Sequence, residues 1–250
     1  MHTRNCTYRN GGRDCENCTV RAYSLCSHLD DAAMTALSSI AQDAHYDKDT
    51  VIFEQNDRFE RMVVVTKGFV RLSRLLSNGK RQITGFIGPG DILGGLKQQS
   101  LCHCTAEAIS DVEACGFKRG ELFGLLRDFP DLCIRLLLAA TDEIEAQYEQ
   151  MTLLGRKMAS QRLAAFLLTM LYRWQREGHQ SSALPLPMTR VDIADYLGLT
   201  VESVSRAFHD IKSQGYIRLP KPSLVELDNL PGLYQLAELE DVPAPRVSMG

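Results

Sequence analysis

Several features that would settle the class of this chain at once are scarce or missing from its sequence. It has only 18 glycines and 9 prolines in 250 residues, so a fibrous repeat or a proline-rich disordered chain is not expected. No apolar run reaches the ~18 to 20 residues of a membrane-spanning helix, and the polar start, Met1 to Cys18, lacks the apolar stretch of a secretion signal. Nucleophile elbows, P-loops, dinucleotide fingerprints and zinc-protease motifs are also absent, which argues against an enzyme. We therefore expect a folded, cytoplasmic protein without a membrane partner.

The chain also lacks a large net charge, but its charges are unevenly distributed. The total is −3, whereas residues 156–222 alone carry 10 basic and 5 acidic side chains. The segments on either side, 1–155 and 223–250, are each net acidic by four charges. A compact basic segment in an acidic chain is typical of a nucleic-acid-binding module. An ordinary solvated helix face is the alternative interpretation.

The first half of the chain is expected to consist mainly of β-strands. Short β-type runs alternate with glycine-containing turns, as in a barrel or roll. The expected strands are 51–53, 62–66, 69–76, 82–87, 105–109 and 112–117. Before them, residues 1–28 are expected to form a polar arm, and Asp30 is a candidate N-cap of a short helix that ends at Ala41. Helical spacing returns after Glu121, so the expected fold class is α+β.

A long helix is expected from Asp131 to Met158, where no proline occurs and the first glycine is Gly155. One stripe of this helix recurs at alternating intervals of four and three residues, namely Leu137, Thr141, Ile144, Tyr148 and Met151. The acidic residues Asp142, Glu143, Glu145 and Glu149 lie off the stripe. The pattern fits a seam between two copies of the chain, and a core helix packed on its own domain is the alternative. A second helix is expected over 159–177, followed by a loop over 178–187.

Two short helices with a tight turn between them are expected from Thr189 to Phe208. The first ends at Gly198, and Thr200 is a candidate N-cap of the second. The expected core-facing side chains are Val191, Ile193, Ala194, Leu197, Val201, Val204, Ala207, Phe208 and Ile211. The outward face of the second helix then carries Glu202, Ser205, Arg206 and His209, which are types that read base edges in the major groove. We therefore predict a helix-turn-helix that binds double-stranded DNA, with 216–219 and 223–227 as the hairpin of a winged variant.

The cysteines are the second chemical signal. Cys15, Cys18 and Cys26 follow one another at C-x2-C-x7-C spacing, so they can serve one metal centre that needs one more ligand. The candidates for that ligand are Cys6, Cys102, Cys104, Cys115 and Cys133, while His28 and His103 suit zinc. Thiolates bind either zinc or an iron–sulfur cluster, and the spacing alone does not distinguish the two. Free thiols without metal are the remaining alternative.

Together these segments resemble the CRP/FNR family of bacterial regulators over roughly residues 15–235. The resemblance is carried by 68–72, 79–83, 89–94, the long helix and 188–206. The stretch Leu197 to Arg206 is similar to the recognition-helix signature of the FNR and FixK branch, and the N-terminal cysteines resemble those of oxygen-sensing FNR proteins. The resemblance implies that Cys115 is the fourth ligand of a [4Fe-4S] cluster. Cys6, Cys102, Cys104 and Cys133 have no counterpart and are interpreted as bystanders.

The resemblance also implies a division of the chain and a set of partners. The expected parts are a cluster-binding arm (1–28), a roll like that of cyclic-nucleotide-binding proteins (29–130), a dimerisation helix (131–158), a winged helix-turn-helix (159–235) and a tail (236–250). The implied partners are a second copy of the chain, RNA polymerase and a two-fold symmetric DNA site with half-sites like TTGAT. Arg206 is expected to read the guanine and Glu202 its paired cytosine. Ser205, Thr189, Arg190, Thr200 and Ser203 complete the expected DNA contacts.

One departure from the family pattern concerns the ligand of the roll. After Gly94 the chain reads on to Thr105 without the carboxylate and arginine that hold a cyclic nucleotide, so no cyclic nucleotide is expected. The sequence thus predicts an oxygen-responsive regulator in which a cluster controls dimerisation and DNA binding at anaerobic or microaerobic genes. Two alternatives stay open. One is a FixK-like regulator with thiol-based or no direct sensing, and the other is a zinc-binding structural or redox module.

Overall fold

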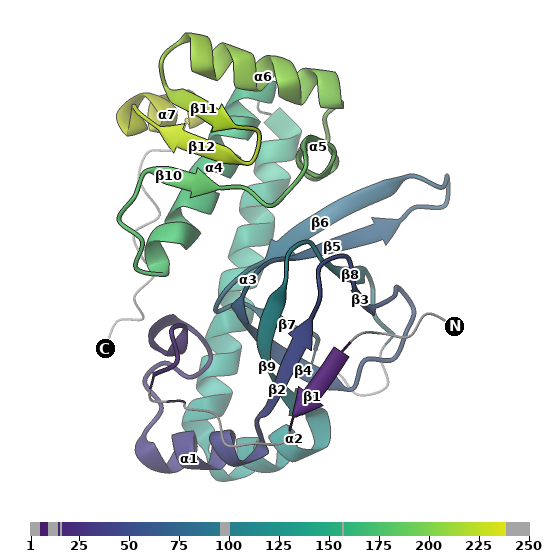
Figure 1. The fold of residues 1–250 in the computed structure, drawn as a ribbon. Coiled ribbons are helices and arrows are strands. Elements are labelled where there is room, and N and C mark those ends of the chain that lie inside the picture. The colour runs from purple at the N-terminus through teal and green to yellow at the C-terminus, as the bar shows by residue number, and fades with distance from the viewer. Residues whose placement is uncertain (1–5, 10–14, 16, 96–100, 157, 239–250) are drawn as a thin grey trace. The chain divides into compact units, whose positions relative to one another are not determined.

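A computed structural model describes residues 6–9, 15, 17–95, 101–156 and 158–238 (Figure 1). The chain divides into two compact units, Met1–Ile144 and Glu145–Gly250. No helix in the described ranges combines the length and apolarity that crossing a membrane requires.

The first unit is built around two antiparallel sheets. The five-stranded sheet has the order β1 (Cys6–Arg9), β2 (Gln42–Tyr46), β9 (Val112–Lys118), β4 (Arg61–Lys67), β7 (Ile92–Leu93). The four-stranded sheet has the order β3 (Val51–Phe53), β8 (Thr105–Ala108), β5 (Val70–Leu75), β6 (Arg81–Ile87). Side chains from both sheets form one core, which includes the fully buried Val63, Val70 and Ala106. This is the expected β-roll.

The five-stranded sheet is also covered on its other face, which produces a second core. Val63 and Val65 of β4 face the interior of the roll, whereas Met62 and Val64 lie in the second core, as the period of two along a strand requires. Helices α1 (Asp31–Ile40) and α2 (Arg119–Asp128) pack there. On β9, Ala114 faces the roll and Cys115 faces the helices. This alternation gives Cys115 its place outside the roll.

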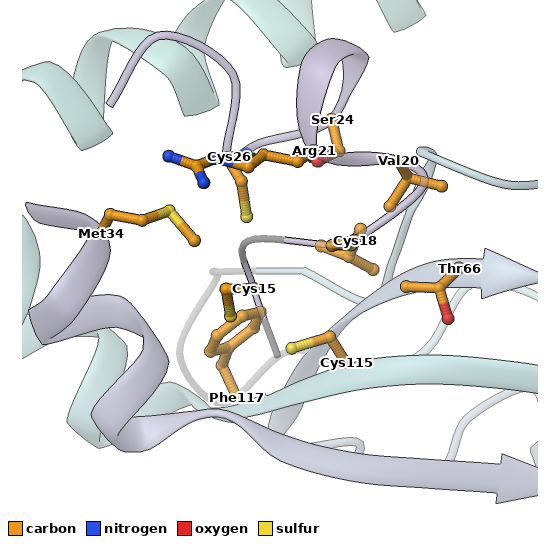
Figure 2. A pocket seen from close by; sticks show the side chains of 11 residues that line it. Cys15, Cys18, Val20, Arg21, Ser24, Cys26, Met34, Thr66, Cys115 and Phe117 are labelled. Atoms are coloured by element: carbon orange, nitrogen blue, oxygen red, sulfur yellow. Dashed lines mark hydrogen bonds between the residues drawn. The ribbon is translucent and has the colours of Figure 1, made fainter. Parts of the chain in front are cut away.

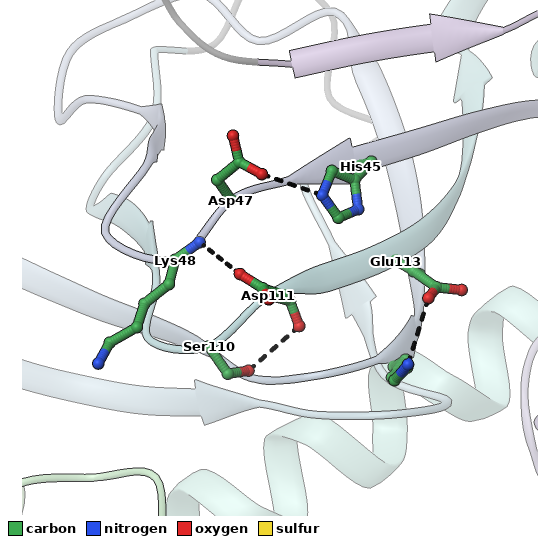
Figure 3. Close-up of polar contacts among 7 residues, drawn as sticks. His45, Asp47, Lys48, Ser110, Asp111 and Glu113 are labelled. Atoms are coloured by element: carbon green, nitrogen blue, oxygen red, sulfur yellow. Dashed lines mark hydrogen bonds and ion pairs between the residues drawn. The ribbon is translucent and has the colours of Figure 1, made fainter.

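Polar contacts fix the turns at one end of the roll (Figure 3). An Asp111 carboxylate oxygen accepts the Lys48 backbone N–H at 3.0 Å, and Lys67 pairs with Glu113 at 3.4 Å. Gly68 lies between β4 and β5 with φ +84°, and a Cβ there would come 2.1 Å from the Asp111 carbonyl oxygen. Only glycine combines that backbone conformation with such a close approach.

The long helix α3 (Pro130–Arg156) contains the division between the units. Leu132 is fully buried at its start, whereas every residue from 140 to 149 is exposed.

The second unit combines helices with a small sheet. Its helices are α4 (Ala159–Arg176), α5 (Arg190–Leu197), α6 (Val201–Ser213) and α7 (Leu230–Ala237). The sheet has the order β10 (Ala183–Pro185), β12 (Leu224–Leu227), β11 (Ile217–Lys221), of which β11 and β12 form the expected wing. The fold class, with its roll, long helix and winged helix-turn-helix, is therefore confirmed.

Several local expectations were wrong or incomplete. The expected loop 178–187 contains β10, which gains its hydrogen bonds from the distant strand β12. In the described part of the arm, β1 pairs with β2 and Arg21–Tyr23 form a 3-10 turn. Val191 and Val201 were expected in the core but are 48% and 36% exposed.

Candidate functional site

The four cysteines expected to share one site line one cavity of the first unit. Cys15, Cys18 and Cys26 come from the arm, and Cys115 comes from β9 (Figure 2). The remaining wall is formed by Val20, Arg21, Ser24, Met34, Val64, Thr66 and Phe117. The fold therefore brings a strand residue and three arm residues together, although they are far apart in the sequence.

The arm is held in place by its own packing. Val20, Leu25 and Leu29 are 2%, 3% and 8% exposed, and the two leucines belong to the second core. Between them the backbone turns twice, with Arg21 N–H donating to the Cys18 carbonyl at 3.1 Å and Ser27 N–H to the Ser24 carbonyl at 3.0 Å. These contacts hold Cys18 and Cys26 on the cavity wall.

The chemistry of the cavity is that of soft sulfur donors in apolar surroundings. None of the described residues that line the cavity is a carboxylate or an imidazole, and Val20, Met34, Val64 and Phe117 supply hydrocarbon and thioether surface. Burial raises the pKa of Cys26 to about 11, despite a hydrogen bond from Ser24 that opposes the shift. This thiol is therefore protonated at neutral pH without metal, and a bound metal must displace its proton.

In this structure the four thiols line one cavity, but they are not arranged as the ligands of one metal ion. Within the ranges that the structure covers, no three His, Cys, Asp or Glu side chains are close enough to hold one metal ion. The donor set fits thiolate-bound iron or zinc by chemistry.

The other cysteines lie elsewhere. Cys102 and Cys104 pack against the core inside the roll, and burial raises the pKa of both thiols. Cys133 is exposed on α3. Cys6 lies in β1, but its side chain is outside the described part of the structure.

The expected dimer stripe is an exposed apolar face of α3. Leu137, Ile144, Tyr148 and Met151 are between 54% and 67% exposed, and Thr141 is exposed between them. Two more apolar residues of α3, Ile134 and Leu138, were not predicted to be exposed, and they are 54% and 45% exposed. Ile134 continues the stripe by one interval of three, a signal that the spacing already contained.

In the second unit, α5 and α6 form a helix-turn-helix whose ends are capped by side chains. At the start of α5, Thr189 Oγ1 accepts the Asp192 N–H at 3.1 Å, and the Asp192 carboxylate accepts the Thr189 N–H at 3.0 Å. Gly198 ends α5 with φ +62°, a left-handed conformation that favours glycine. Thr200 Oγ1 then accepts the Ser203 N–H at 3.2 Å and starts α6.

The first two turns of α6 present the expected DNA-reading side chains to solvent. Glu202, Ser205 and Arg206 are exposed, while Val204, Ala207 and Phe208 are buried. The Arg206 guanidinium donates to Ser203 Oγ at 3.1 Å. The pKa of Glu202 is lowered, first by its own backbone N–H at the helix start and then by Thr200.

Arg190 has a different environment from the other expected DNA contacts. Its guanidinium carbon lies 3.3 Å from the centre of the Phe208 ring, a cation–π contact that joins α5 to α6. Burial lowers the pKa of this arginine. In this structure Arg190 therefore stabilises the helix pair, and Thr189 and Thr200 act as caps.

Comparison with known proteins agrees with this architecture. A cyclic nucleotide-binding domain model matches residues 44–129, and a Crp-like helix-turn-helix domain model matches residues 161–236. The nitrogen fixation regulation protein FixK of Bradyrhizobium diazoefficiens is 35% identical over 87% of this chain and 91% of its own length. The transcriptional activator protein FnrL of Cereibacter sphaeroides is 31% identical over 82% of this chain and 84% of its own.

Solved structures show the same likeness. The alignment with the structure of FixK2 from Bradyrhizobium japonicum covers 79% of this chain and 97% of the FixK2 chain, with a TM-score of 0.73 and 35% identity. The roll and the helix-turn-helix thus each match a family model, and the FixK and FnrL relatives that align with most of the chain are named as regulators. The chain belongs to the CRP/FNR family of DNA-binding transcription regulators and is not an enzyme.

Proposed function

We propose that this protein is an oxygen-responsive regulator that holds a [4Fe-4S] cluster on Cys15, Cys18, Cys26 and Cys115. The observation that carries the proposal is that these four thiols line one apolar cavity. Similarity to FnrL supports the FNR-like reading. We further propose that it acts in the cytoplasm, where it controls anaerobic or microaerobic genes together with RNA polymerase.

The cysteines would act as a clamp between the arm and the roll. Cys115 is fixed on β9 by ladder pairs with Val64 and Asp43, whereas the other three thiols belong to the arm. A group bound by all four ties these parts together and stabilises the state that binds it. When bound, a [4Fe-4S] cluster would supply the reactivity with oxygen, and without it the arm cysteines would no longer be tied to Cys115.

Dimerisation is the step through which the clamp is proposed to act. Two copies of α3 packed along the exposed stripe would bury Leu137, Ile144, Tyr148 and Met151. The nearby carboxylates of residues 142, 143, 145 and 149 bring like charges close to the seam and keep association weak. A weak seam can respond to a small change in stability.

The roll is proposed to act without a cyclic nucleotide, although it matches the cyclic nucleotide-binding domain model. Cys102, Cys104, Phe59 and Leu72 pack against its apolar core, and none of these side chains can neutralise a phosphate. Part of the segment on which this expectation rests, 96–100, lies outside the described residues.

A FixK-like regulator without a cluster is the second candidate. The FixK relative is 35% identical to this chain, and free thiols in the same cavity would then respond directly to oxidation. A zinc site on the same donors is the third outcome that an experiment must separate.

Anaerobic reconstitution with iron and sulfide separates these candidates. We expect a visible chromophore with iron and sulfide bound, and its loss on Cys→Ser substitution at position 15, 18, 26 or 115. Cys102→Ser, Cys104→Ser and Cys133→Ser are matched controls that keep the chromophore. A preparation with stoichiometric zinc and no iron, or with no metal at all, contradicts the cluster assignment.

A further inference from the structure

The wall of the cysteine cavity contains a permanently charged side chain. Among the described wall residues, Arg21 carries a positive charge, and the others are thiols, hydroxyls or apolar groups. Arg21 is half-buried. A guanidinium in such surroundings has lost part of its hydration, so it gains most from an anionic partner.

The fold places Arg21 on the short turn between the second and third cysteines. Its backbone N–H donates to the Cys18 carbonyl at 3.1 Å, and it opens the 3-10 turn Arg21–Tyr23. Figure 2 shows its side chain beside Cys26, on the side of the cavity that Met34 closes. Arg21 is itself one of the residues that line the cavity, so its charge acts on whatever the thiols bind there.

The loaded site needs such a charge. Four thiolates bring more negative charge than an iron–sulfur core or a zinc ion offsets, so the occupied site is net anionic. Burying an uncompensated anion among Val20, Met34 and Phe117 is costly. A positive charge at the wall lowers that cost in the loaded state and has little to act on when the thiols are protonated.

We propose that Arg21 is the charge-compensating residue of the cysteine site and controls how firmly the site holds its metal. The inference rests on the proposed function and deepens it. It also predicts an electrochemical effect, because a nearby cation favours the reduced, more negative form of a cluster and raises its reduction potential.

Arg21→Gln tests the inference because it removes the charge while keeping a polar side chain with hydrogen-bond donors. The full-length protein is reconstituted anaerobically, and the rate of iron loss to an excess of chelator and the reduction potential are measured. We expect Arg21→Gln to lose iron about tenfold faster and to have a more negative potential. Arg58→Gln, which removes the same charge from an exposed residue outside the cavity, should match the wild type.

Arg21→Lys separates a charge effect from a structural one. Lysine should restore most of the retention because it restores the charge. If Arg21→Lys loses iron as fast as Arg21→Gln, and both substitutions lower the melting temperature of the metal-free protein, Arg21 has a structural role and the inference is wrong. Unchanged retention and potential in Arg21→Gln would also overturn it.

The metal that the wild-type protein binds shows whether the cluster assignment or the role of Arg21 has failed. If it loads a cluster, the Arg21 variants decide this inference alone. If it takes zinc, the cluster assignment fails, and the rate of zinc release from the same variants decides the role of Arg21. If it binds no metal, both proposals are overturned.

Discussion

Glu202 and Arg206 are four residues apart on the exposed face of α6, so one turn of the helix presents both to the same groove. If they read one G·C pair, Arg206→Ala and Glu202→Ala should each flatten the preference for that pair by about 1–3 kcal/mol. Binding to a panel of single-base variants of the site at fixed salt measures this preference. Lys212→Ala, which removes a charge from the last turn of α6, should leave it intact. Uniform weakening across the panel would mean that Arg206 and Glu202 do not read bases.

At the residue scale, the sequence predicted which side chains are suited to bind DNA or metal better than it predicted what surrounds them. The types and spacing of Glu202, Ser205 and Arg206 were enough to place them on an exposed face, because helical periodicity is local. Arg190 was not predictable in the same way, since its contact with the Phe208 ring depends on how two helices cross. The face of β9 on which Cys115 lies was also not predictable, because both faces of the five-stranded sheet are covered and only Glu113 and Lys118 of β9 are exposed.

At the element scale, the helix-turn-helix depends on a buried carboxylate. Asp192 is 2% exposed and accepts hydrogen bonds from the Thr189 N–H at 3.0 Å and the Thr189 hydroxyl at 2.7 Å. Asp192→Ala leaves these donors without their acceptor and should lower the free energy of unfolding by about 1–3 kcal/mol. Urea denaturation measures the change, and Asp210→Ala on the exposed face of α6 is the control. Equal stability of the two variants would show that the Asp192 carboxylate contributes nothing to stability.

A second prediction at the element scale concerns dimerisation through α3. Ile144→Glu puts a charge in the exposed stripe next to Glu143 and Glu145, and two copies would then bring these charges together. The variant should be monomeric by analytical ultracentrifugation even when metal is bound. Ala146→Glu adds the same charge about half a turn around the helix and should leave the dimer intact. A dimeric Ile144→Glu protein would place the interface elsewhere.

Elements differed in how well the sequence predicted them. The strands from β3 to β9 were mostly found because turns with glycine separate them, whereas the two-residue β7 and three-residue β10 were missed. Such short strands exist only through pairing with a distant partner, which local propensity does not contain. Helix α7 was missed too, although Asn229 caps it and a proline stands in its first turn.

At the scale of the whole molecule, we propose that occupation of one cavity in the first unit controls DNA binding by the second unit. The convergence of Cys15, Cys18 and Cys26 on Cys115 was expected only through a family resemblance, because spacing along the chain does not reveal which distant strand the arm packs against. The structure brings the four thiols to one cavity. What remains to be measured is whether occupation of that cavity and DNA binding change together.

One titration measures both the occupation of the cavity and the binding of DNA. Anaerobically loaded protein is bound to a fluorescent duplex with two TTGAT half-sites, and oxygen is added stepwise while the absorption of the chromophore and the anisotropy of the DNA are followed in the same sample. We expect absorption and anisotropy to fall together, and the Cys115→Ser protein to bind the duplex weakly from the start. Loss of the chromophore with DNA binding retained, or equally tight binding by the Cys115→Ser protein, would contradict it.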